Sequence, residues 1–203
     1  KENLFEITNY SNLDNERTKK YQAEAQRKTL ESSSFNVDEC LKSLKMKAEF
    51  IKVSEQIFPR VSQLTQRTNQ FNARTIRYDE SKIKKISNDE NYISFGYKLK
   101  DKFGDHGLVG LVILHKVNDL FLFIDTFCMS CRVFNRGFEH FIMNHIKGIM
   151  FDRGYQHLVV EWIPTEKNDI VRSFFSSLGF ENFENEKGKL HIDKIKINKY
   201  HIN

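Results

Sequence analysis

The sequence predicts an α+β fold: a mixed central sheet with flanking helices, preceded by a small helical N-terminal segment. Two observations carry this prediction. Residues 1–70 have mainly helical patterns, whereas strand and helix patterns alternate from Phe71 onward. Within the second part, "YISFGYKLK" alternates apolar and polar residues as a half-buried strand does. We therefore divide the chain into a helical segment, residues 1–70, and an α+β domain, residues 71–203.

The helical segment is predicted to contain helices and one short strand. Asp14 and Asn36 are suited to cap helix starts, because their side chains accept hydrogen bonds from free N–H groups. Glu39, which follows Asn36 at the spacing of a capping box, strengthens the second start. The expected helices cover residues 15–31, 37–46 and 60–69, and the expected strand covers residues 49–53.

The α+β domain is predicted to follow the order β-α-β-β-β-α-β-α-β-β. Gly154 and Gly179 stand where helices are expected to end, a position that favours glycine. "DKFGDHG" is typical of a hairpin turn between two strands. The expected strands cover residues 73–78, 92–100, 108–116, 120–127 and 157–162, the helices cover residues 80–88, 137–151 and 169–178, and a final hairpin covers residues 180–198.

Composition limits the function classes. The net charge of +5 and the pI near 9.0 suit an acidic partner, such as a phosphorylated cofactor, an acidic carrier protein or nucleic acid, or serve solubility alone. Motifs of known nucleic-acid binders are absent, so we expect no nucleic-acid partner. The longest apolar run, "GLVGLVIL", is short for a bilayer span, and no secretion signal is recognisable. We expect a cytoplasmic protein without a membrane partner, and the first residue, Lys1, suggests a piece of a longer chain.

The stretch "SCRVFNRGFEH" joins a predicted strand to a predicted helix through a turn that contains arginines. The first N–H groups of a helix have no partner within the helix and carry partial positive charge, so they favour an anion such as phosphate. We predict that Arg132, Arg136 and the backbone amides up to Gly137 contact phosphate oxygens.

Two motifs resemble the GNAT acyltransferases, in which such a turn holds the pyrophosphate of coenzyme A. Residues 132–137 match the pattern Gln/Arg-x-x-Gly-x-Gly/Ala, with Val133 inside it and Asn135 in place of the first glycine. Asparagine tolerates the left-handed backbone better than most residues, so the turn can still form. The resemblance implies that Phe127, Cys128 and Met129 present backbone groups to the pantetheine.

"NDIVRSFFSSLGF" resembles a second GNAT motif. Asn168 falls on a cofactor-contacting asparagine of that motif, and Phe175 falls on the tyrosine that usually protonates the departing thiolate. Because phenylalanine has no hydroxyl, that step is not available here in its common form.

A resemblance to the FkbH-like family covers nearly the whole chain. It rests on five motifs in order: "KYQAEAQR", "VSQLTQRTNQFN", "DKFGDHGLVG", "CMSCRVFNRGFEH" and "PTEKN". Members join an N-terminal haloacid-dehalogenase (HAD) domain to a C-terminal GNAT-like domain and load a glyceryl unit onto the phosphopantetheine thiol of an acyl carrier protein. The resemblance implies coenzyme A or phosphopantetheine as cofactor and an acyl carrier protein as partner. It also implies that residues 1–70 are the tail of a HAD domain and a linker, since the Asp-x-Asp-x-Thr motif of that domain is absent.

Three residues are candidates for catalysis, each with a structural alternative. Cys131 is an acyl acceptor at a helix start or a buried structural cysteine. His106, with Asp105, is a general base or part of a hairpin turn. Glu161 is a base for water-mediated deprotonation or an ordinary strand carboxylate. Cys128 and Cys131 have a C-x-x-C spacing, but no second pair accompanies them, so we expect packing rather than a metal.

"TNQFN", residues 68–72, carries neutral amides that suit pantetheine or glyceryl hydroxyls, or it packs as a hinge. Together these features favour an acyltransferase-type domain of a carrier-loading protein. The alternative is a module of the same protein that docks the carrier without catalysis, which Asn135 and Phe175 favour.

Overall fold

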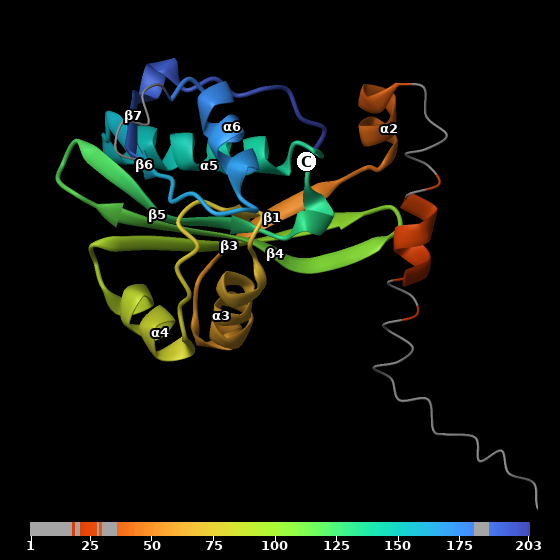
Figure 1. Cartoon of the computed structure of the whole chain (residues 1–203), viewed down its shortest axis with the longest axis horizontal. Helices are drawn as coiled ribbons and strands as arrows, with labels where there is room; N and C mark the ends of the chain where they lie inside the picture. The colour runs from red at the N-terminus through yellow and green to blue at the C-terminus, as the bar shows by residue number, and fades with distance from the viewer. Residues whose placement is uncertain (1–17, 19–20, 28, 30–35, 181–186) are drawn as a thin grey trace, which may run out of the picture.

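A seven-stranded mixed sheet lies at the centre of the computed structural model, which describes residues 18, 21–27, 29, 36–180 and 187–203 (Figure 1). Six strands follow the order β1-β3-β4-β5-β6-β7, and the short β2 pairs with β5. All pairs are antiparallel except β5 with β6. The strands are β1 (Lys47–Lys52), β2 (Phe71–Asn72), β3 (Tyr92–Asp101), β4 (Gly104–Lys116), β5 (Phe121–Met129), β6 (His157–Glu161) and β7 (Lys187–His191).

Helices cover both faces of the sheet, with α5 and α6 on one side and α3 and α4 on the other (Figure 1). Burial from both sides explains why β4 carries the apolar run of the sequence. The helices are α2 (Val37–Ser43), α3 (Phe58–Arg67), α4 (Glu80–Asn88), α5 (Phe138–Arg153) and α6 (Asp169–Ser177), and single 3₁₀ turns are η1 (Glu55–Ile57), η2 (Cys131–Val133) and η4 (Ile192–Lys194).

The predicted α+β class is confirmed, and several local predictions hold. Asn36 caps α2, since its side chain accepts a hydrogen bond from the N–H of Asp38 at 2.9 Å. α5 ends at Gly154, whose φ of 76° is left-handed. No helix in the described ranges is long and apolar enough to cross a membrane.

The strand predicted over 73–78 is wrong, because only Phe71 and Asn72 form a strand there. Ala73 still bonds through its backbone, whereas the N–H of Thr75 donates to the Asn72 side chain and Thr75 has a left-handed φ of 52°. This is a case in which tertiary contacts override a β-forming composition.

Of the final hairpin expected over residues 180–198, the described residues contain β7, which pairs with β6. After β7 the chain makes η4 and then runs without a strand, while residues 181–186 lie outside the described residues. Of the first expected helix, residues 21–27 are helical, and Asp14 lies outside the described part.

Elements before residue 71 pack into the same layers as those after it. β1 pairs with β3 along its whole length, and Val61 and Leu64 of α3 share an apolar core with Leu111 of β4. Ile202, the residue before the last, bridges to Met46 beside β1. The assignment of residues 1–70 to the tail of another domain stays a prediction.

Candidate functional site

A groove with a volume of about 470 Å³ lies between the C-terminal end of α3 and the turn after β5. We call it the basic groove. One wall comes from α3 and the loop that follows it, and the other comes from the end of β5 and from η2. Its lining residues are Arg60, Gln63, Leu64, Arg67, Thr68, Asn69, Gln70, Phe71, Met129, Ser130, Cys131, Arg132 and Lys167.

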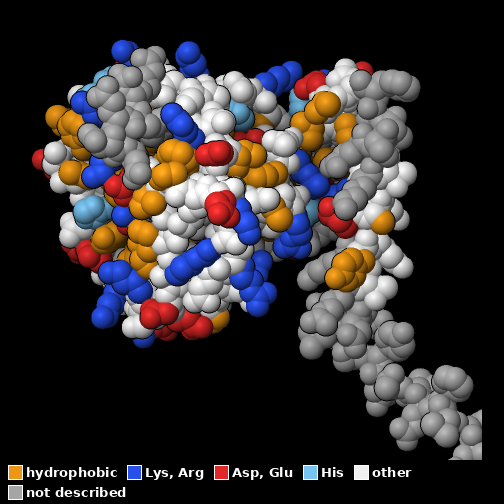
Figure 2. Space-filling view, in the orientation of Figure 1, with side chains coloured by type: hydrophobic (Ala, Val, Ile, Leu, Met, Phe, Trp, Pro, Cys, Tyr) orange, Lys and Arg blue, Asp and Glu red, His pale blue; other side chains and the backbone are white. Residues whose placement is uncertain are grey.

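Four of these residues are cations, namely Arg60, Arg67, Arg132 and Lys167, and none of the described lining residues is acidic. Burial, followed by the positive charges of Arg132 and Arg67, lowers the pKa of Arg60. Several Lys and Arg side chains are visible on the face of the molecule that Figure 2 presents. The basic groove therefore suits an anion, and arginine is especially suited to phosphate oxygens.

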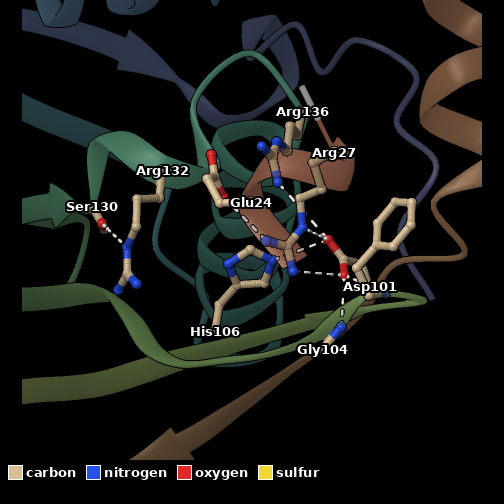
Figure 3. Close-up of polar contacts among 9 residues, drawn as sticks. Glu24, Arg27, Asp101, Gly104, His106, Ser130, Arg132 and Arg136 are labelled. Atoms are coloured by element: carbon tan, nitrogen blue, oxygen red, sulfur yellow. Dashed lines mark hydrogen bonds and ion pairs between the residues drawn. The ribbon is translucent and has the colours of Figure 1, made fainter. Parts of the chain in front are cut away.

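Cys131 is an exposed thiol in the wall of this groove. Its neighbour Arg132 is also exposed, and the Arg132 Nε donates to the Ser130 hydroxyl at 3.3 Å (Figure 3). Cys128, by contrast, is buried in the core, and burial raises the pKa of its thiol to about 12. The two cysteines of the C-x-x-C spacing thus lie in different environments. In the described ranges no group of His, Cys, Asp and Glu side chains could hold a metal ion.

The turn before α5 forms as predicted, but the expected phosphate cradle over the helix start is covered. Asn135 has a left-handed φ of 56° and Gly137 one of 78°. A Cβ on Gly137 would lie 2.7 Å from the Cβ of Tyr200, so the C-terminal segment rests on this turn. Burial raises the pKa of Glu139, in the first turn of α5, and the N–H groups of Glu139 and Gly137 offset this only in part. Val133 is fully buried in the core.

Arg136 does not join Arg132, because the two side chains point apart (Figure 3). Arg136 is buried, and its Nη1 lies 3.9 Å from the Asp101 carboxylate. Arg27 donates to the same carboxylate at 2.6 and 3.0 Å, and His106 Nε2 lies 3.1 Å from it. We call Arg27, Asp101, His106 and Arg136 the buried ion cluster.

This arrangement corrects the predicted pair of Asp105 and His106. Asp105 accepts from the N–H of Gly107 at 2.6 Å, while His106 contacts Asp101 and lies outside the basic groove. Burial raises the pKa of Asp101, but hydrogen bonds from His106, Arg27 and the N–H of Phe103 outweigh it, so the pKa lies well below its ordinary value. His106 therefore has a structural partner and no access to a substrate in the groove.

The sheet splits where β5 and β6 diverge, and a segment of the chain itself fills the split. The parallel pairing ends at Ile124 and Val160, although β5 continues to Met129. Phe71 and Asn72 pair with Met129 and Cys128, and the Ala73 N–H donates to the carbonyl of Phe127 at 3.3 Å. On the other side, the Ile163 N–H donates to the Ala73 carbonyl at 2.9 Å. We call Phe71–Arg74 the inserted segment.

The inserted segment corrects the prediction that Phe127, Cys128 and Met129 offer backbone groups to a pantetheine. Their free edge is occupied by the segment, and their other edge pairs with β4. The aromatic ring of Phe71 fills the remaining space, with ring centroids of Phe127 and Phe134 each 5.1 Å away.

Glu161 and Asn168 both hold this segment instead of a ligand. Glu161 accepts from Arg74 Nε at 2.6 Å and lies 3.5 Å from Lys187 Nζ, so its carboxylate is committed to ion pairs. Asn168 is fully buried, and its amide donates to the Asn72 carbonyl at 3.1 Å and to the Ile163 carbonyl at 2.9 Å. Neither residue has the geometry of its predicted role. Phe175 is likewise fully buried in the aromatic core.

Of the predicted site residues, the basic groove brings together Met129, Cys131 and Arg132. The prediction missed Arg60, Arg67 and Lys167, which come from separate parts of the sequence. A signal was present, because "TNQFN" and "PTEKN" supply groove residues and were recognised as motifs.

Comparison with known proteins shows the fold of this chain. No protein family model and no curated protein matches the sequence. The structure is similar to the ribosomal-protein-S18-alanine N-acetyltransferase from Escherichia coli, with 15% identity, a TM-score of 0.54, and coverage of 75% of this chain and 99% of that one. It is also similar to an acetyltransferase of the GNAT family from Desulfovibrio desulfuricans, with 11% identity, a TM-score of 0.56, and coverage of 71% and 99%.

A third similar structure is the spermidine N-acetyltransferase from Vibrio cholerae, in complex with CoA and spermine. Its identity is 12%, its TM-score is 0.53, and the match covers 73% of this chain and 97% of that one. The described chain therefore has the fold of the GNAT acetyltransferases, which confirms the GNAT-like sheet predicted from the sequence.

Proposed function

We propose that this chain is an acyl-transfer domain that binds the phosphopantetheine arm of an acyl carrier protein, or the same arm of coenzyme A, in the basic groove. The observation that carries the proposal is the exposed Cys131 thiol in a groove whose described lining residues include four cations and no acidic side chain. The cations would bind the phosphate of the arm, with Arg132 beside the thiol. Cys131 would hold the acyl group.

The chemistry that fits these residues is thioester exchange. The sulfur of Cys131 attacks the carbonyl carbon of an acyl thioester, a new C–S bond forms, the old C–S bond breaks, and the donor thiol leaves with the proton. The pantetheine thiol of the carrier then attacks acyl-Cys131 in the same way and restores the free cysteine. The groove cations would stabilise the negative charge that develops on the carbonyl oxygen.

Exchange between thiols also fits a groove whose described lining residues include no general base. Transfer to an amine or hydroxyl usually requires a general base, yet the lining residues that the structure describes include no carboxylate and no imidazole. Glu161 is held in ion pairs and His106 is hydrogen-bonded to Asp101, both outside the groove, and Phe175 has no proton to donate. A cysteine needs less help, because a thiolate is itself a strong nucleophile.

The resemblance to the FkbH-like family supports a small acyl unit such as glyceryl and a carrier protein as partner. Three of the five motifs behind that resemblance supply residues to the basic groove: "VSQLTQRTNQFN", "CMSCRVFNRGFEH" and "PTEKN". On this proposal the chain acts with a HAD domain that would deliver the acyl group.

The first test follows the acyl group by intact mass. We expect incubation with acetyl-coenzyme A to add one acetyl group to the chain, and expect a holo-acyl carrier protein to remove it. Cys131→Ala should abolish the adduct, whereas Cys40→Ala should keep it, because Cys40 is buried. An adduct that survives Cys131→Ala would refute the role of this thiol.

The second test measures binding by calorimetry. Arg132→Ala and Lys167→Ala should each weaken the binding of coenzyme A by about 1–3 kcal/mol, the range for one charge-assisted contact. Arg153→Ala is the matched control, since Arg153 lies at the end of α5 and does not line the groove. If Arg132→Ala and Lys167→Ala bind coenzyme A as tightly as the Arg153→Ala control does, the groove is not the binding site.

One observation favours the alternative, a docking module without catalysis. The split between β5 and β6 is filled by the inserted segment, so no pantetheine can pair with these strand ends as the GNAT resemblance implies. The two tests separate the alternatives, because a docking module binds coenzyme A and never carries an acetyl group on Cys131.

A further inference from the structure

Two carboxylates face the split in the sheet at the point where β5 and β6 stop pairing. Asp125 follows Ile124 in β5, and Glu161 follows Val160 in β6. Both side chains are largely buried, at 12% and 18% exposure. Two negative charges that are both largely buried repel each other and would push the two strand ends apart. A cation between them offsets this repulsion.

Arg74 supplies that cation from the inserted segment. Its Nη1 donates to an Asp125 carboxylate oxygen at 2.8 Å and to the Asp125 carbonyl at 3.1 Å, and its Nε donates to Glu161 at 2.6 Å. The guanidinium also lies over the ring of Phe123, 5.1 Å from its centroid. One side chain therefore bridges both strands and closes the split.

The closed split fixes one wall of the basic groove. Thr68–Phe71 line the groove, and Phe71 is also the first residue of the inserted segment. Inside this stretch the Asn72 amide donates to the Thr68 carbonyl at 3.3 Å, and Asn168 holds the Asn72 carbonyl. Thr75, just after Arg74, keeps a left-handed φ of 52° that is unfavourable for a β-branched residue. This backbone persists because its surroundings hold it in place.

We propose that Arg74 is a positioning residue of the basic groove. It does not line the groove, yet it holds the inserted segment in the split and thereby sets the distance between the wall at Thr68–Phe71 and the wall at Met129–Arg132. Without it the segment leaves the strand ends, and the cations of the two walls no longer converge on one anion. The role of the groove as an anion site rests on the proposed function.

The test compares Arg74→Gln with a triple variant that also carries Asp125→Asn and Glu161→Gln. Arg74→Gln should weaken binding of inorganic pyrophosphate roughly tenfold, the loss expected for about one charge-assisted contact. It should also speed hydrogen exchange of residues 68–74. The triple variant removes the two negative charges that Arg74 no longer bridges, so it should regain thermal stability, while affinity and exchange remain those of Arg74→Gln.

A purely structural role predicts a different result, because affinity would then return with stability in the triple variant. Arg172→Gln is the control, since Arg172 is a surface cation that lies 5.2 Å from the Trp162 ring and outside the groove, and it should change neither readout. Unchanged exchange of residues 68–74 in Arg74→Gln would overturn the proposal. If the unaltered chain binds no pyrophosphate, the proposed function fails, and hydrogen exchange still decides the role of Arg74.

Discussion

The buried ion cluster predicts a large effect for Asp101→Asn. The Asp101 side chain is 0% exposed and accepts hydrogen bonds from Arg27, from the N–H of Phe103 at 2.9 Å and from the N–H of Gly104 at 3.1 Å. Asparagine has the same size but carries no charge. The change therefore leaves Arg27 and Arg136, which are 4% and 6% exposed, without their shared counter-charge.

Breaking one side of a buried ion pair costs about 3–5 kcal/mol. Arg27 retains Glu24 as a second, partly exposed partner, so we expect the lower half of that range. Against a total stability of about 5–15 kcal/mol for a folded protein, such a loss is large. For a chain of this length each kcal/mol corresponds to roughly 2–4 °C in Tm, and we expect a drop of about 6–15 °C.

Urea denaturation followed by circular dichroism measures this loss directly. Asp105→Asn is the control, because the exposed Asp105 side chain near the start of β4 accepts a hydrogen bond from the N–H of Gly107 and belongs to no buried ion pair, so its loss should stay within about 1 kcal/mol. The pKa of Asp101 is lowered, so its contribution is complete above the unfolded value of about 3.9 and is lost as the pH falls below it. The gap between Asp101→Asn and the unaltered chain should thus shrink below about pH 4. A loss below 1 kcal/mol at pH 7 would refute the reasoning.

Two more substitutions test the core and its titration. Phe175→Tyr should not raise acyl transfer and should destabilise the chain by about 1–3 kcal/mol in thermal unfolding, because it places a hydroxyl where the ring is fully buried; higher transfer would argue for the common GNAT route. Burial lowers the pKa of His145 to about 4, and its Nδ1 lies 2.8 Å from the Tyr97 hydroxyl. The pKa of histidine in the unfolded chain is about 6.5, so the stability that neutral His145 contributes is complete above that pH. This contribution should fall by about 1–2 kcal/mol toward pH 4, a figure reduced for the partial exposure of the side chain. His145→Phe should remove that loss in melting curves recorded at several pH values. If the variant loses as much stability toward pH 4 as the unaltered chain does, the loss does not come from His145.

The sequence predicted the elements whose signals are local. β3 lies on a stretch that alternates apolar and polar residues, β4 carries the longest apolar run, and α5 ends at a glycine. Asn135 was expected to accept a left-handed backbone and does. Each of these features depends on residues close together in the chain.

Features that depend on distant contacts were not predictable in the same way. β2 has two residues, too few to show a period, and it exists because the split between β5 and β6 leaves backbone groups to be paired. The roles of Glu161 and Asn168 changed for the same reason, since both bond to the inserted segment. The basic groove draws its cations from α3, η2 and the loop before α6, so no single stretch of sequence contains it.

The five motifs meet in two places, and the turn before α5 connects them. "KYQAEAQR" contributes Arg27 to the buried ion cluster and "DKFGDHGLVG" contributes Asp101 and His106, whereas the other three motifs supply the basic groove. "CMSCRVFNRGFEH" belongs to both, because Arg132 reaches the groove and Arg136 reaches the cluster. The cluster thus anchors the turn that presents Cys131. It follows that Asp101→Asn should weaken pyrophosphate binding even at temperatures where the variant is fully folded, whereas a substitution that only lowers stability, such as Phe175→Tyr, should leave that affinity unchanged.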